Sequence, residues 1–139
     1  MVLMKESTVR ERGLGRLATL EYVATAGIEP ARMGYAPALA RRELFHETGL
    51  TTADIGTVEL NEAFAAQAVA VIKDAKLDPE KTNPYGGAIA LGRPLGATGA
   101  ILILRATKDL KRRDLEYGVI TMCIGGGQAL AAHIRRYEA

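Results

Sequence analysis

The pattern of apolar and polar positions predicts strands and helices that alternate along the chain. Apolar and β-forming residues favour a strand over residues 16–26, and a second, shorter strand follows at 57–60. Apolar side chains at helical spacing predict a helix over 36–48, with Gly49 as its C-terminal stop. The alanine-rich segment 63–75 predicts another helix.

The strongest predicted helix covers Ala97 to Arg113. The run from Ile101 to Leu104 is apolar around the whole circumference, which implies burial on every side, whereas the second half turns polar and basic. The segments 117–124 and 128–136 then flank a glycine triplet and predict an antiparallel hairpin. We therefore expect an α/β fold: a mixed sheet of about five strands with helices on both faces.

Length and composition limit the function. The chain has 139 residues, the size of one domain, and we expect a short N-terminal lead-in over residues 1–15. A net charge of +2 gives no argument for binding nucleic acid, and the longest apolar run, 100–104, is too short to cross a bilayer. A single cysteine cannot form an internal disulfide and no signal-peptide pattern precedes the fold, so we expect a cytoplasmic location.

Three segments combine glycine or other small residues with one prominent polar group each. They are Asn61 to Phe64, Asn83 to Ala100 and Cys123 to Gly127, and the second carries seven glycines and prolines before the apolar helix. Glycine and proline in this density indicate tight loops. We expect the three loops to converge on one site.

Each polar residue of these loops has a structural and a functional interpretation. Cys123 is either a small buried core residue, which its spacing alone favours, or a nucleophile or acid/base beside a glycine nest. Asn61 is either the N-cap of the next helix, favoured by local sequence, or an amide that orients a water or ligand oxygen. Arg93 either binds a carboxylate or phosphate or lies in solvent.

No residue pattern predicts a metal or a dinucleotide. His46 and His133 have no partner in sequence that completes a metal site, and we expect none. The glycines at Gly13 and Gly125 lack the wider spacing that a dinucleotide-binding loop requires.

Taken together and in this order, the three loops are specific. VELNEAFAAQ, GGAIALGRPLGATGA and CIGGGQA resemble the asparagine loop, the GHP loop and the CxG loop of thiolases, and the resemblance to a thiolase C-terminal half covers nearly the whole chain. It implies an acyl-CoA C-acyltransferase, which makes or cleaves 3-ketoacyl-CoA in fatty acid metabolism, with coenzyme A thioesters as substrates and no separate cofactor.

The resemblance also assigns roles to residues. It implies that Cys123 is the acid/base cysteine, that Asn61 holds the water of one oxyanion hole, and that the N–H of Gly125 contributes to the other. Ala63 and Phe64 would lie beside the acyl end of the substrate.

Two departures from the family pattern raise a second hypothesis. The nucleophilic cysteine belongs to the N-terminal half, so we expect this chain to be inactive alone, and Arg93 stands where the family has a histidine that activates the nucleophile. An always-protonated guanidinium donates hydrogen bonds but cannot be a base. The alternative is therefore a non-catalytic module for assembly or acyl-CoA binding. In either case we expect Ala97 to Arg113 to pair with a second copy, as a dimer, or with a separate N-terminal half.

Overall fold

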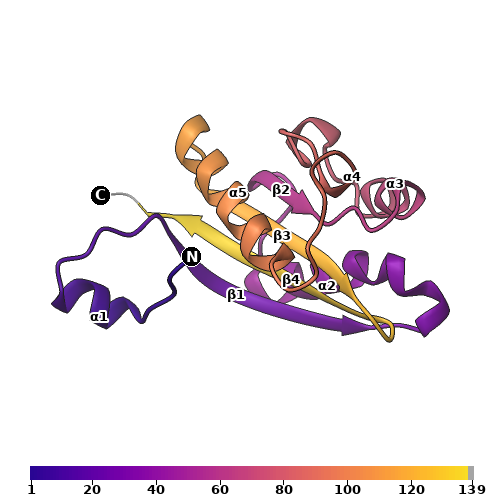
Figure 1. Cartoon of the computed structure of the whole chain (residues 1–139), viewed down its shortest axis with the longest axis horizontal. Helices are drawn as coiled ribbons and strands as arrows, with labels where there is room; N and C mark the ends of the chain where they lie inside the picture. The colour runs from indigo at the N-terminus through magenta and orange to yellow at the C-terminus, as the bar shows by residue number, and fades with distance from the viewer. Residues whose placement is uncertain (138–139) are drawn as a thin grey trace.

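A four-stranded mixed sheet forms the centre of the computed structural model, which describes residues 1–137 (Figure 1). The strand order is β1-β4-β3-β2; β1 pairs antiparallel with β4, β4 antiparallel with β3, and β3 parallel with β2. The strands are β1 (Ala18–Gly27), β2 (Ile55–Leu60), β3 (Tyr117–Ile124) and β4 (Gln128–Arg136).

The expectation of five strands is wrong for the described residues. Beyond β2 the chain adds only an isolated bridge between Val58 and Thr82. The extension stops there because Asn83 takes a left-handed conformation, with φ 49°, and Pro84 has no N–H to donate to a ladder.

The remaining elements are helical. They are α1 (Glu6–Glu11), a 3₁₀ helix η1 (Pro30–Tyr35), α2 (Ala36–Thr48), α3 (Ala65–Asp74), a 3₁₀ helix η2 (Pro79–Lys81), α4 (Ala88–Leu91) and α5 (Thr98–Arg113). Helix α1 belongs to the expected lead-in; it buries none of its residues, and Figure 1 shows it apart from the sheet. No helix within residues 1–137 combines the length and the apolar character needed to cross a membrane.

Helices α2 and α5 cover opposite faces of the sheet, as predicted. The alternation along β4 shows this directly, because neighbouring residues point to opposite faces. Ala131 belongs to the core cluster that contains Leu44 of α2, whereas Ala132 belongs to the cluster that contains Leu110 of α5. The two halves of the core are therefore separated by the sheet.

Helix α5 departs from the expected burial on every side. Leu102 is 6 % exposed, but Ile101, one position earlier, is 37 % exposed. Only one stripe of the helix packs on β2, β3 and β4, because a single sheet face contacts a single face of a helix. In this chain the opposite stripe meets solvent.

Candidate active site

The loops that follow β2 and β3 lie side by side at one edge of the sheet. Parallel strands bring their carboxyl ends to the same edge, and here the Asn61 N–H donates to the Thr121 carbonyl at 2.9 Å. Cys123 is two residues beyond Thr121 on β3. The parallel pairing thus places the Asn61 loop and the Cys123 loop next to each other.

Cys123 is half-buried rather than part of the closed core. Burial raises the pKa of its thiol, and the Arg93 guanidinium is close enough to oppose that rise electrostatically. The third predicted loop therefore also reaches this edge, with Arg93 itself exposed between α4 and α5. A thiol in this setting holds its proton at neutral pH unless another group lowers its pKa further.

Asn61 is not the N-cap of α3. That helix begins at Ala65, and the oxygen that meets the N–H groups before it is Oε1 of Gln67, which accepts from Ala63 at 3.1 Å and from Phe64 at 3.4 Å. Asn61 is instead only 4 % exposed, and no donor among the described residues reaches its Oδ1. A buried acceptor left unsatisfied costs about 1–3 kcal/mol, so this amide oxygen is suited to a hydrogen bond from a water or a ligand.

The three glycines of the β3–β4 hairpin serve different purposes. Gly126 and Gly127 have φ of 83° and 88°, and a Cβ on Gly127 would lie 2.1 Å from the Ile28 carbonyl oxygen, so the turn itself requires them. Gly125 has no left-handed φ, and nothing lies within 4 Å of a Cβ placed there. The backbone at Gly125 is therefore open to close approach, although the fold would accept a side chain.

Phe64 and Ala63 border the same edge. Phe64 is 62 % exposed and Ala63 is half-buried, immediately after Asn61 and Glu62. An exposed aromatic ring beside a polar site offers an apolar contact surface.

The histidines lie elsewhere. His133 is buried on β4 with its ring centroid 5.1 Å from that of Tyr117. Exposed His46 on α2 has ligand atoms within 4.8 Å of those of Glu43 and Glu47, a set that could hold a metal ion but that solvated helix surfaces also show without one. This cluster is next to Tyr22 in the body of β1, whose hydroxyl donates to Glu47, rather than at the loop edge.

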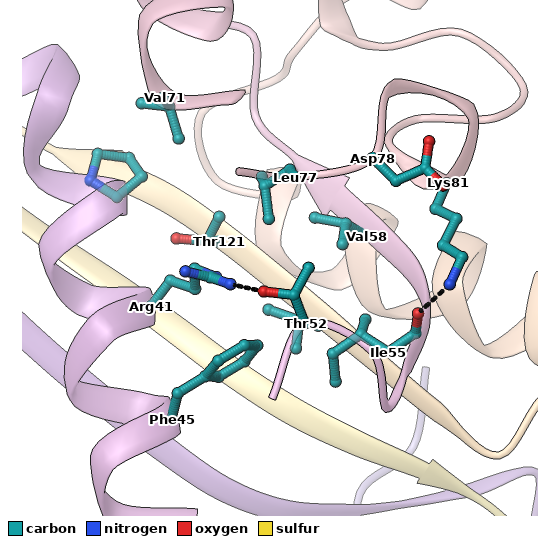
Figure 2. A pocket seen from close by; sticks show the side chains of 12 residues that line it. Arg41, Phe45, Thr52, Ile55, Val58, Val71, Leu77, Asp78, Lys81 and Thr121 are labelled. Carbon is teal, nitrogen blue, oxygen red and sulfur yellow. Dashed lines mark hydrogen bonds between the residues drawn. The ribbon is translucent and has the colours of Figure 1, made fainter. Parts of the chain in front are cut away.

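A small cavity lies between α2 and β2, on the face of the sheet that α2 covers (Figure 2). Arg41 reaches across it, donating to Thr52 with its guanidinium 4.2 Å from the Phe45 ring centroid, and Lys81 donates to the Ile55 carbonyl at 3.1 Å. Its volume of about 10 Å³ accommodates at most one water molecule and no acyl chain.

Sequence reasoning predicted no role in joining the loops for three residues that do connect them. They are Glu62, Asn83 and Arg105, whose side chains connect the end of β2, the segment before α4, and α5. Their only signal in the sequence is their position. Glu62 is next to Asn61, Asn83 precedes the Gly86-Gly87 pair, and Arg105 interrupts an otherwise apolar stretch of helix.

Comparison with known proteins identifies the fold and the family. A family model described as the thiolase C-terminal domain matches residues 14–136. The crystal structure of the Bacillus anthracis acetyl-CoA acetyltransferase superposes with a TM-score of 0.93 at 40 % sequence identity, over 96 % of this chain and 34 % of that chain. The chain belongs to the thiolase family and corresponds to its C-terminal domain.

Curated relatives agree with this assignment. The beta-ketothiolase BktB of Cupriavidus necator and the acetyl-CoA acetyltransferase of Escherichia coli K12 are each 45 % identical over 136 residues. Each match covers 98 % of this chain and 34 % of the relative, so the chain spans about a third of the length of the relatives it matches.

Proposed function

We propose that this domain supplies the acid/base half of a thiolase active site and acts on acyl-CoA, in condensation or in thiolytic cleavage of 3-ketoacyl-CoA. The observation that supports this most strongly is the meeting of Asn61, Cys123 and Arg93 at one sheet edge. A role in fatty acid metabolism and a cytoplasmic location belong to the same proposal.

In the condensation direction the chemistry divides between two polypeptide segments. A cysteine of the N-terminal half takes the acyl group from one acyl-CoA, and coenzyme A thiolate leaves. Cys123, as its thiolate, removes a proton from the α-carbon of a second acyl-CoA, and the resulting carbanion attacks the acyl-enzyme carbonyl. The nucleophile is released as a thiolate and 3-ketoacyl-CoA forms.

The remaining residues of the edge would stabilise charge. Buried Asn61 would hold, through its unsatisfied Oδ1, the water that donates to one thioester oxygen, and the backbone N–H of Gly125, a residue whose Cβ position is unobstructed, would donate to another. Phe64 and Ala63 would contact the acyl end of the substrate. Arg93 can donate to an oxyanion but cannot accept a proton from the nucleophile.

The chain alone should therefore show no thiolase activity. We would incubate it with acetyl-CoA and with acetoacetyl-CoA and search for a covalent adduct by mass spectrometry, with Cys123→Ser as the control. A mixture with the part of BktB outside the matched third should restore thiolysis of acetoacetyl-CoA. An acyl-Cys123 species that turns over in the isolated chain would contradict the proposal.

The rival function is a non-catalytic module for assembly or acyl-CoA binding. Arg93 at the histidine position favours it, and so does a Cys123 thiol whose pKa is raised by burial. Calorimetric titration of the chain with acetyl-CoA tests for binding, and thiolysis of acetoacetyl-CoA by the mixture with an N-terminal half separates the two functions. A module of this kind would bind acetyl-CoA, and its complex with an N-terminal half would still fail to turn over.

A further inference from the structure

Two loops of the candidate site are joined by the side chains of Asn83 and Glu62. Asn83 is paired with the backbone of Leu60: its Oδ1 accepts from the Leu60 N–H and its Nδ2 donates to the Leu60 carbonyl, both at 2.9 Å. The Asn83 N–H also donates to Val58 at 2.8 Å. One side chain thus takes the place of a neighbouring strand at the last residue of β2, directly before Asn61.

Glu62, directly after Asn61, continues the connection. Its Oε1 accepts from Asn83 Nδ2 at 3.1 Å, and its Oε2 accepts from the Ile89 N–H of α4 at 3.0 Å. Carboxylate oxygens make stronger hydrogen bonds than neutral acceptors, so this one residue ties the Asn61 loop both to Asn83 and to α4. Arg93 follows four residues after Ile89.

Gly87 shows how closely the carboxylate is enclosed. A Cβ on Gly87 would lie 2.1 Å from Cδ of Glu62, although the φ of Gly87, −107°, is open to any residue. Gly87 is therefore required by Glu62 and not by its own backbone. Arg105 of α5 adds support from the other side, since it donates to the Gly86 carbonyl and pairs with Glu59 at 3.0 Å.

We propose that Glu62 and Asn83 are positioning residues that hold the Arg93 loop against the Asn61 and Cys123 loops. As positioning residues they would act not on the substrate or the thiol but by fixing where Arg93 lies relative to Cys123. The inference extends the proposed function, because it explains how its site is assembled. The experiments that test it need no turnover. The positioning role can therefore be disproved while the proposed function holds, and the proposed function can be disproved while the positioning role holds.

The first measurement is amide hydrogen exchange by NMR on the isolated chain. In Glu62→Ala the Ile89 N–H loses its acceptor, and we expect its exchange to accelerate at least about tenfold, while core amides such as that of Ile120 keep their protection. Gly87→Ala, which pushes the carboxylate aside, should do the same. In the double variant Glu62→Ala, Gly87→Ala, exchange at Ile89 should be no faster than in Glu62→Ala, because the methyl group at position 87 then has room. Additive effects, or unchanged exchange at Ile89, would overturn the proposal.

The second measurement reports on position rather than stability. Cys123 is the chain's single cysteine, so the rate of its alkylation against pH gives the pKa of one thiol. Arg93→Gln removes the cation that lowers this pKa, and alkylation at a fixed pH below it should slow about two- to threefold. Glu62→Ala should slow alkylation by a similar factor. In the Arg93→Gln variant, the further change Glu62→Ala should cause no additional slowing.

Two controls distinguish the proposed positioning role from a general loss of structure. Glu43→Ala removes an exposed carboxylate of α2, with the same change in charge, and should leave both measurements at their wild-type values. If Glu62→Ala does not fold, Glu62→Gln keeps one of the two acceptors and should give an intermediate exchange rate at Ile89. A wild-type alkylation profile in a folded Glu62→Ala or Glu62→Gln variant would show that Arg93 is held by something else.

Discussion

Arg93 is the residue of the candidate site that fits the proposed function least, because a guanidinium cannot act as the base that activates the nucleophile. If an N-terminal half restores activity, Arg93→His should raise the rate of the reconstituted complex, because a positioned histidine used in acid–base catalysis contributes about 10²–10⁴-fold. Thiolysis of acetoacetyl-CoA, followed at saturating coenzyme A, measures it. Arg93→Lys is the matched control, since it keeps a cation without adding a base. A slower histidine variant would assign arginine a role of its own, such as binding a substrate carboxylate.

At this scale the sequence predicted that the three loops lie close together, but not all of the contacts that their residues make; the roles of the site residues stay predictions. Asn61, Arg93 and Cys123 do meet at one edge, but Asn61 as an N-cap was wrong, because a Gln67 side chain meets the N–H groups of Ala63 and Phe64. The contacts by which Glu62 and Asn83 connect the loops were not predicted. Their partners are 21 to 27 residues away in the chain, and local spacing carries no information about such pairs.

At the scale of elements, the packing of β2 against α5 contains a buried carboxylate. Glu59 is fully buried, and burial raises its pKa from 4.5 to about 7, with Arg105 opposing that rise at a distance of 3.0 Å. The neighbouring Asp109 and Glu62 carboxylates raise it further. The folded protein therefore keeps a proton on Glu59 at pH values where the unfolded chain has lost it.

This arrangement predicts a pH-dependent stability with a definite sign. Below pH 4.5 both states are protonated, and between about pH 4.5 and 7 the folded state loses free energy relative to the unfolded chain, by roughly 3 kcal/mol in total. Above pH 7 the loss is constant. Glu59→Gln removes the ionisable group, so its unfolding free energy relative to wild type should rise between pH 5 and 8.

Urea unfolding at a series of pH values measures that difference. Taking the difference cancels the contribution of His133, whose burial lowers its pKa and which therefore destabilises the fold as pH falls. The exposed Glu43→Gln serves as the control for lost charge and should give a flat difference. A flat difference for Glu59→Gln as well would mean that Arg105 keeps Glu59 ionised throughout.

Element positions were mostly predictable because they follow from local periodicity. Helix α2 and the β3–β4 hairpin have the predicted bounds, whereas β1 and α3 begin two residues late, β2 begins two residues early and the fifth strand is missing. The errors at α3 and at the fifth strand arise at loop ends. Extended Phe64 delays the start of α3, and left-handed Asn83 with Pro84 ends strand pairing beyond β2.

At the scale of the whole molecule, one of the exposed apolar surfaces lies at the start of α5. Exposed apolar side chains lie along α4, the loop after it and the start of α5, with Ile89 and Leu91 each 63 % and Leu95 87 % exposed. Each of them would gain roughly 1.5–3 kcal/mol on full burial, and a domain's net stability is only about 5–15 kcal/mol. Leaving several in water is therefore costly, and a partner that covers them gains most of that free energy.

We therefore predict that the chain associates through the outer stripe of α5 and the neighbouring α4 segment, as a dimer or with an N-terminal half. Ile101 is the residue to change, because it is exposed on that stripe, whereas Ile103 packs against the core under α5 and its replacement by lysine would also destabilise that core. Light scattering should give a mass above 14.9 kDa for the wild type and close to that of one chain for Ile101→Lys.

The control for this experiment is an apolar residue with similar exposure on a different surface. Leu20 of the edge strand β1 is 42 % exposed, and Leu20→Lys adds the same charge there. If association uses α5, this variant keeps the wild-type mass. If Leu20→Lys is the one that dissociates, the chains pair through the free edge of β1, as unprotected edge strands commonly do. A wild type that stays monomeric at high concentration would show that the apolar stripe is tolerated in water, and the association predicted from α5 would be wrong.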